Sequence, residues 1–347
     1  MRISKTIIAC GVAMTAALSA SPCSRVTYMA ADTTEVMVGR TLDWRTPIPT
    51  NLYVYPAGIS KEGMPSGPTY HWTSKYGSVM AVSYDGGVTE GMNECGLVMN
   101  GLFCKTGQYR TDENAPEGTP VMSLAVLVSY FLDNFATVDE AYDWFVKNDF
   151  AISGKTFDGG TVSQLHWAIT DATGNTMVIE YDHGDVKLYK GRELQVLTND
   201  PGLPQMQAIN AYWEGVGGTN MLPGTVRSSD RFVRASFFIH HTPTDLKGME
   251  AVSALSTVMA NVSVPYGYNI QGEPNVSMTQ WRSIADLKNK VYYFRFADTL
   301  GNFWIDLSKL MLTPGSPVLK LDTSKYRAVY GCVNDKLQST QPFSPMW

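Results

Sequence analysis

Three residues near the start of the chain combine a nucleophile, a cation and a carboxylate: Cys23, Arg40 and Asp43. The segments "CSRVTYM" and "EVMVGRTLDW" are typical of strands, and "AADTT" between them predicts a turn. A turn centred near Thr33 places Cys23 opposite Asp43 at the open end of a hairpin, with Arg40 a few residues away. A cation lowers the pKa of a nearby thiol, and a carboxylate orients donors and accepts protons. The spacing fits nucleophilic catalysis, and it fits equally a carboxylate that ends a strand beside a solvent-exposed arginine.

Cys23 stands where a secretory leader is predicted to end. "MRISK" is a positive n-region, and "TIIACGVAMTAALSA" is an apolar h-region that ends in small residues. We therefore expect residues 1–22 to be removed and the protein to be periplasmic or secreted. Pro22 fits neither a lipoprotein signal, which needs a small residue before the cysteine, nor a signal-peptidase site. Cleavage after Ala20 followed by a second event is one route, and the route stays open.

If Cys23 becomes the first residue, it carries a free α-amine. The reference pKa of this amine is about 8, so part of it is an unprotonated base at neutral pH. The amine lies within reach of the sulfur of the same residue. Nucleophile and base would then belong to one residue, and no histidine would be needed.

The elements that must position these residues indicate an α+β protein. Further strands are predicted at "TNLYVYPAG", "GSVMAVSYDGG" and "CGLVMNGLF", and a meander follows from residue 165 to 200. Helices are predicted around 119–133, at "TVDEAYDWFVKN" with a capping box of Thr137 and Glu140, at "SSDRFVRASFFIHH" and at "MEAVSALSTVMANV". Long antiparallel runs with segregated helices favour layers of sheet and helix over a doubly wound fold. No repeat or linker interrupts residues 23–347, so we expect one domain there.

Composition narrows the classes of function. The chain is 44% hydrophobic and 17% charged, with a formal net charge of −5, and loss of residues 1–22 removes only basic charge. These values argue against a nucleic-acid surface. The run "VMSLAVLVSYFL" is too short to span a membrane. The sequence has no G-x-S-x-G or H-E-x-x-H motif and no Cys/His spacing typical of a metal site. Cys95 and Cys104 are expected to be small buried hydrophobes, and the disulfide state of Cys95, Cys104 and Cys332 is open.

Several segments in consistent order resemble one known family. "CSR…GRTLDW", "YDGGVTEGMNECGL", "LTNDPG", "MLPGTVRSSDRFVRASF" and "NVSVPYGY" together resemble the choloylglycine hydrolase family. Its members are conjugated bile acid hydrolases and penicillin V acylases of the N-terminal nucleophile (Ntn) hydrolase superfamily. "WTSKYGSV" and "QWRS" look most like the exported Gram-negative branch. The resemblance implies a four-layer αββα sandwich, two packed antiparallel sheets flanked by helices, and hydrolysis of a linear amide without a cofactor or metal. It also implies a homotetramer.

The resemblance assigns roles position by position. Cys23 would be the nucleophile, with its amine as the base. Arg40 would support the thiolate, and Asp43 would interact with the amine and the sulfur. Asn199, after the strand "ELQVLT", would donate its side-chain amide to the oxyanion, although alone it would be taken for a turn residue. Arg231 would steady the cluster from the first turn of a helix capped by Ser228 or Ser229, a poor place for a cation without an anionic partner.

One departure from the family concerns the acyl pocket. Many relatives have Asn, Tyr or Trp after "GL" in the second strand motif, where this chain has Phe103. Phenylalanine has no polar group, so any second oxyanion donor there must be the backbone N–H. Phe103 and Trp44 are expected to wall the pocket.

Three substrate classes share an apolar acyl group and a scissile amide, so the sequence does not separate them. Bile salts joined to glycine or taurine are the first expectation, and penicillin V and N-acyl homoserine lactones are the alternatives. A catalytically silent exported binding protein, with a lipidated or blocked Cys23, is the alternative from another class.

Overall fold

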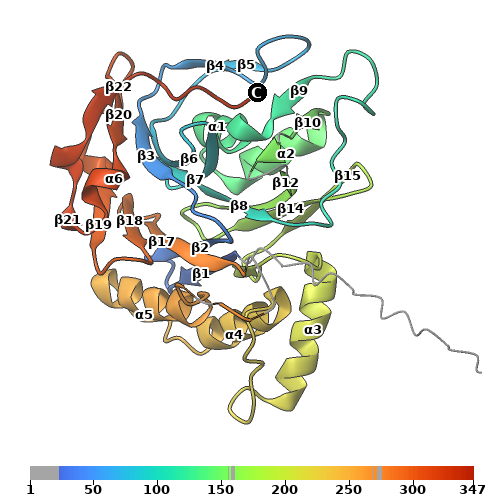
Figure 1. The fold of residues 1–347 in the computed structure, drawn as a ribbon, viewed down its shortest axis with the longest axis vertical. Helices are drawn as coiled ribbons and strands as arrows, with labels where there is room; N and C mark the ends of the chain where they lie inside the picture. The colour runs from blue at the N-terminus through green and yellow to red at the C-terminus, as the bar shows by residue number, and fades with distance from the viewer. Residues whose placement is uncertain (1–22, 155, 158–160, 268, 272–275) are drawn as a thin grey trace, which may run out of the picture.

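Two large sheets pack face to face between two layers of helices (Figure 1). The structure is a computed structural model, and it describes residues 23–347 apart from 155, 158–160, 268 and 272–275. The predicted leader, residues 1–22, lies outside these residues. The predicted α+β fold with an αββα sandwich is confirmed.

The first sheet contains the strands that carry the candidate site. Its seven described strands run in the spatial order β16 (Val196–Leu197), β1 (Ser24–Met29), β2 (Val36–Trp44), β17 (Met278–Asp286), β18 (Val291–Phe296), β19 (Asn302–Asp306) and β21 (Tyr330–Cys332). Neighbouring strands are antiparallel except β19 and β21. The helices α3 (Leu203–Val216), α4 (Ser228–His240) and α5 (Gly248–Asn261) lie on the outer side of this sheet (Figure 1).

The second sheet is antiparallel throughout its nine described strands. Their spatial order is β15 (Asp185–Lys190), β14 (Thr176–Asp182), β13 (Leu165–Thr170), β8 (Val98–Phe103), β7 (Gly87–Asn93), β6 (Ser78–Ser83), β3 (Thr50–Tyr55), β20 (Val318–Leu321) and β22 (Gln338–Thr340). The helices α1 (Leu124–Asn134) and α2 (Val138–Lys147) cover its outer face (Figure 1).

The remaining elements are short. They are the strand pairs β4 (Ser60–Glu62) with β5 (His71–Thr73), β9 (Val121–Ser123) with β10 (Ala151–Ser153) and β11 (Thr156–Phe157) with β12 (Thr161–Val162), the helix α6 (Thr323–Tyr326), and 3₁₀ turns at Leu307–Lys309 and Asn334–Lys336. No helix in the described part of the chain is long and apolar enough to cross a membrane.

β2 is buried along its whole length because it is covered on both faces. Val36, Val38 and Leu42 pack against β3 and β6 of the second sheet, while α5 covers the other face. Gly39 permits that close approach, since a Cβ added there would lie 2.6 Å from Met259 Cγ of α5. The end of β2 that carries Arg40 and Asp43 is therefore held between the second sheet and the helix layer, as a rigid site requires.

The observed elements confirm one expectation about the helices and correct two others. The Thr137 cap of α2 is confirmed, with the Thr137 side chain accepting from the Glu140 N–H. The helix expected around 119–133 begins only at Leu124, because β9 occupies 121–123. Helix α3 was not predicted. Its apolar residues Leu203, Met206, Ile209, Trp213 and Val216 do recur at helical spacing, but only Leu203 and Met206 of the fourteen residues are buried.

Candidate active site

Cys23 lies directly before β1 with its side chain only 4% exposed. The hairpin forms, but its register is one residue from the predicted one. Ser24 pairs with Thr41, so continuing that register sets Cys23 opposite Leu42 and not opposite Asp43. The turn is centred half a residue earlier than expected, which shifts every facing pair by one. The Cys23 thiol still reaches Asp43, whose backbone carbonyl lies 3.8 Å from Sγ.

Asn199 joins the start of β1 to the end of β8. Its Oδ1 accepts from the Cys23 backbone nitrogen at 2.7 Å and from Arg231 Nη2 at 2.7 Å. Its Nδ2 donates to the Phe103 carbonyl at 2.6 Å. A side-chain amide nitrogen carries two hydrogens, and the Phe103 carbonyl uses one of them. The structure thus brings Asn199 into contact with Cys23.

Arg231 lies in the first turn of α4, as predicted, and is fully buried, but the predicted serine cap is wrong. Arg227 is the N-cap residue and makes no side-chain cap, while Ser228 Oγ accepts from the Asn199 backbone N–H at 2.8 Å. The Ser228 hydroxyl therefore supports the loop that carries Asn199. Arg231 Nη1 donates to the Cys23 carbonyl and to Ser24 Oγ, both at 2.6 Å. Burial lowers the pKa of Arg231 to about 10, and the nearby Asp43 carboxylate opposes that shift.

Asp43 is a buried carboxyl group between two arginines. Thr41 Oγ1 donates to its Oδ2 at 3.0 Å, and no donor among the described residues meets its Oδ1. Burial raises the pKa of Asp43 to about 6, against the opposing effects of Arg231, the Thr279 and Thr41 hydroxyls and Arg40. This carboxyl group can therefore change its charge near neutral pH when its surroundings change.

Arg40 acts on Cys23 through its charge and not through direct contact. Its Nη1 lies 3.2 Å from Glu90 Oε2, its Nη2 donates to the Gly101 carbonyl at 2.9 Å, and its guanidinium stacks over the Trp281 ring. Burial raises the pKa of the Cys23 thiol, and the Arg40 charge lowers it by less. The predicted direction of the Arg40 effect is right, but burial outweighs it, so the net shift favours the protonated thiol.

A buried polar network behind Arg40 was missed by the sequence-based prediction. Glu90 is fully buried on β7, where its Oε1 accepts from the Ser283 and Tyr292 hydroxyls and its Oε2 from Asn100 Nδ2. Arg25, also fully buried, donates to Asn100 Oδ1. The sequence gives a partial sign of this network, because Glu90 alternates with the apolar Met92 on one face of β7, whereas Val88 lies beyond a register shift and packs in another core cluster.

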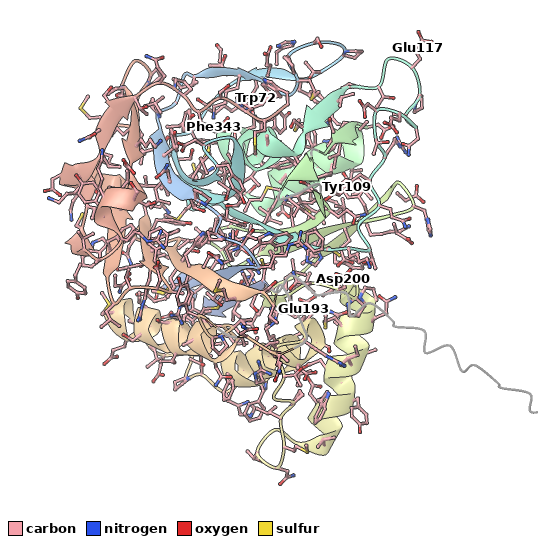
Figure 2. All side chains as sticks on the ribbon, viewed as in Figure 1. Trp72, Tyr109, Glu117, Glu193, Asp200 and Phe343 are labelled. Carbon is pink, nitrogen blue, oxygen red and sulfur yellow. The ribbon has the colours of Figure 1, made fainter. Side chains whose placement is uncertain are left out.

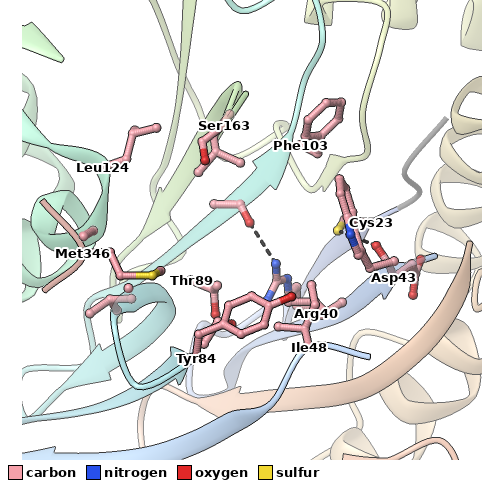
Figure 3. A pocket seen from close by; sticks show the side chains of 18 of the residues that line it. Cys23, Arg40, Asp43, Ile48, Tyr84, Thr89, Phe103, Leu124, Ser163 and Met346 are labelled. Atoms are coloured by element: carbon pink, nitrogen blue, oxygen red, sulfur yellow. Dashed lines mark hydrogen bonds between the residues drawn. The ribbon is translucent and has the colours of Figure 1, made fainter. Parts of the chain in front are cut away.

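An apolar pocket opens beside Cys23 (Figure 3). Its volume is about 150 Å³, and Trp44 and Phe103, both predicted to wall it, are among its lining residues. Their rings meet edge to face with centroids 5.5 Å apart. Further apolar residues that line it include Leu42, Ile48, Val88, Leu124, Leu165 and Met346. Because the sulfur lies at one side of an apolar cavity, the site can hold an apolar acyl group next to a nucleophile.

The other cysteines among the described residues, Cys95, Cys104 and Cys332, are free. Cys104 is buried as expected, Cys95 is half-buried and Cys332 is exposed. In the described part of the chain, no group of three or more His, Cys, Asp or Glu side chains is placed to hold a metal ion.

His166 supports the same site from β13. Its Nδ1 lies 3.1 Å from Glu180 Oε1 and its Nε2 2.9 Å from the carbonyl of Thr198, the residue before Asn199. Both partners are acceptors, so the doubly protonated ring satisfies both contacts. Burial lowers the pKa of His166, but Cys104 and Glu180 raise it by more, so the net shift is well above the ordinary value.

This contact predicts a pH-dependent stability. A histidine with a raised folded-state pKa stabilises the protein fully below its unfolded pKa of about 6.5, and the stabilisation is lost as pH rises through the folded pKa. We expect the free energy of unfolding of the wild type to fall across that window in urea titrations. His166→Gln should be less stable at neutral pH and should lose that part of the slope. His183→Gln, at a side chain that is 82% exposed, is the matched control. Equal slopes for wild type and His166→Gln would contradict the assignment.

Comparison with known proteins places this geometry in context. A family model described as linear amide C–N hydrolases, choloylglycine hydrolase family, matches residues 23–324. The chain is 35% identical over 367 residues to a penicillin V acylase of Pectobacterium atrosepticum, covering 99% of this chain and 97% of that protein. It is 25% identical to a bile salt hydrolase/transferase of Clostridium perfringens, over 63% of this chain and 72% of that protein. The solved structure of penicillin V acylase from Agrobacterium tumefaciens superposes with a TM-score of 0.85 at 41% identity, covering 93% of this chain and 99% of that one.

Proposed function

The chain belongs to the choloylglycine hydrolase family of linear amide C–N hydrolases, and we propose that Cys23, freed as the first residue, is the nucleophile of this hydrolysis. The observation that carries the proposal is the placement of Cys23. Its backbone nitrogen is bound by Asn199, and its sulfur faces the apolar pocket. The nitrogen proposed as the base and the sulfur proposed as the nucleophile thus each have a defined position in the site.

The raised pKa of the Cys23 thiol means that the reaction needs a base beside the sulfur. Burial raises the pKa of Cys23, so the thiol must lose its proton during the reaction. No histidine is among the residues that line the described pocket. An α-amine with a reference pKa of about 8 can take this proton. The freed amine would have further hydrogens to donate, and the buried Asp43 Oδ1 is an acceptor that no described donor uses.

The reaction then proceeds in two balanced steps. The α-amine takes the thiol proton while Cys23 Sγ bonds to the amide carbon, and the C–N bond breaks as the leaving amine takes that proton from the ammonium. A water molecule next attacks the thioester carbon and gives a proton to the α-amine. The C–S bond then breaks, the carboxylic acid leaves, and the α-ammonium returns the proton to the sulfur. Asn199 would donate the second hydrogen of Nδ2 to the oxyanion of each step. Arg231 would hold Asn199 and Cys23 in register.

We propose aryl- and alkyl-acyl amides of the penicillin V type as the substrate class. Two penicillin V acylases are similar to this chain at 35% and 41% identity, whereas the bile salt hydrolase/transferase stands at 25%. The aromatic walls of the pocket, Trp44 and Phe103, suit a flat aryl group. Conjugated bile salts, the first expectation from sequence, become the second candidate, supported by the bile salt hydrolase relative. N-acyl homoserine lactones stay a third.

A substrate panel tests this order. We expect kcat/KM for penicillin V to exceed that for glycocholate and taurocholate by at least about tenfold, the discrimination that a few apolar contacts provide. Release of the amine product from each substrate, including an N-acyl homoserine lactone, measures it. Cys23→Ala protein gives the background rate. Faster cleavage of either bile salt would reverse the order, and cleavage of none would contradict the proposed class.

We also propose that the protein is exported and that Cys23 is exposed by removal of residues 1–22. The leader pattern and the burial of Cys23 at the site support this proposal. A homotetramer stays a prediction from the family, open to light scattering of the purified protein.

A further inference from the structure

The end of the chain returns to the candidate pocket. After β22, Phe343 is buried with its N–H donating to the Tyr55 hydroxyl at 2.9 Å, and its ring meets those of Tyr53 and Tyr55 edge to face. Figure 2 shows Phe343 against the second sheet, near the helices that cover it. The match to the family ends at residue 324, so this anchored tail, residues 341–347, lies beyond it.

Met346 of this tail is fixed beside the pocket. Its backbone N–H donates to the Gly86 carbonyl at 2.9 Å, and its side chain is one of those that line the pocket. A Cβ added to Gly86 would lie 2.5 Å from Met346 Cγ, so the tail packs closely on the β6–β7 turn. Figure 3 shows Met346 and Leu124 at the side of the pocket away from Cys23.

We propose that Met346 is a specificity-determining residue that forms the far wall of the acyl pocket and limits the length of the acyl group. The inference rests on the proposed function, since it takes the pocket beside Cys23 as the acyl site. An acyl group whose carbonyl lies at Cys23 extends along the cavity toward Met346. The length of chain that fits is therefore set by the side chain at this end.

The chemistry of methionine suits such a wall. The side chain is apolar, unbranched and flexible, and Met346 is 43% exposed, so one of its faces is not packed in the core. Replacement by alanine removes three heavy atoms from the end of the cavity and leaves the backbone bond to Gly86 in place. The tail should stay anchored, because Phe343 and not Met346 is buried in the core.

A binding series tests the proposal without requiring turnover. The probes are straight-chain alkanoates from butanoate to dodecanoate, which are products expected of acyl-amide hydrolysis, with Kd measured by calorimetry. For the wild type, we expect affinity to rise about fourfold per methylene and to level off where the chain meets Met346. Met346→Ala should move that limit outward by about two methylenes, so that it binds the longest probes about fifteenfold more tightly than the wild type does.

Two variants serve as controls. Met346→Leu keeps the side-chain volume, and Met221→Ala removes the same atoms from an exposed methionine that does not line the pocket. Both should follow the wild-type curve. An unchanged limit in Met346→Ala, or binding of no alkanoate by the wild type, would overturn the inference. Wild-type protein that binds the series but hydrolyses no N-acyl amide would instead contradict the proposed function, while the length limit would still support a role for Met346.

Discussion

Cys23→Ala protein is expected to lose amide hydrolysis by about 10⁵-fold or more while retaining its fold. Removal of a nucleophile leaves only the contribution of binding and of the oxyanion site to the rate. The substitution deletes one sulfur atom and keeps the backbone N–H to Asn199 and the carbonyl contact to Arg231. Steady-state hydrolysis of penicillin V measures the effect, and circular dichroism checks the fold.

The control for this variant is Cys95→Ala. Cys95 is half-buried, and its backbone accepts from Lys290 far from the pocket lining, so its loss should leave the rate within about twofold. N-terminal sequencing of Cys23→Ala separates a failure of processing from the loss of the nucleophile. Turnover retained in correctly processed Cys23→Ala protein would rule out the nucleophile assignment.

Asn199→Ala should lower kcat by about 10²–10³-fold with a much smaller change in KM. An oxyanion donor stabilises charge that develops only in the transition state, so its loss raises the barrier without weakening ground-state binding equally. Asn199 also holds Cys23 and Arg231, so a second variant must separate the two roles. Asn199→Asp keeps an acceptor oxygen for both partners but removes the donor, and it should lose kcat to a similar extent.

Asn210→Ala is the matched control for these variants. Asn210 lies on α3, where its amide donates to Glu214 of the same helix. Its loss should not change kcat. A rise in KM with unchanged kcat in Asn199→Ala would show that Asn199 contributes to binding alone. A large fall in the free energy of unfolding would show that it acts mainly as a structural link.

The fold was largely predictable because its elements follow local rules. The Thr137 cap, the alternation of the strands and the apolar faces of α4 and α5 each depend on a few consecutive residues. Helix α3 shows the limit of such rules, since it was missed although its apolar residues recur at helical spacing and only two of them, Leu203 and Met206, are buried. The one-residue error in the β1–β2 register arose in the turn, whose centre the residue types of "AADTT" do not determine.

The residues that form the candidate site were named in advance, but the buried residues that hold them in place were not. Cys23, Asn199 and Arg231 are distant in sequence, and the family resemblance, not any local spacing, indicated that they meet. Glu90 and His166 were not predicted as part of it. Their roles depend on contacts between strands that are remote in sequence, such as that of His166 with Thr198. Tertiary contacts of this kind determine whether a buried charge is paired, and no pattern within a short stretch of sequence predicts them.

The most direct test of the proposed mechanism is N-terminal sequencing combined with intact mass of a fully active preparation. If one residue supplies both nucleophile and base, active chains begin Cys-Ser-Arg-Val, and the active fraction equals the fraction that starts at Cys23. A preparation in which Ser21, Pro22 or an earlier residue remains attached while every chain turns over at the full rate would contradict it.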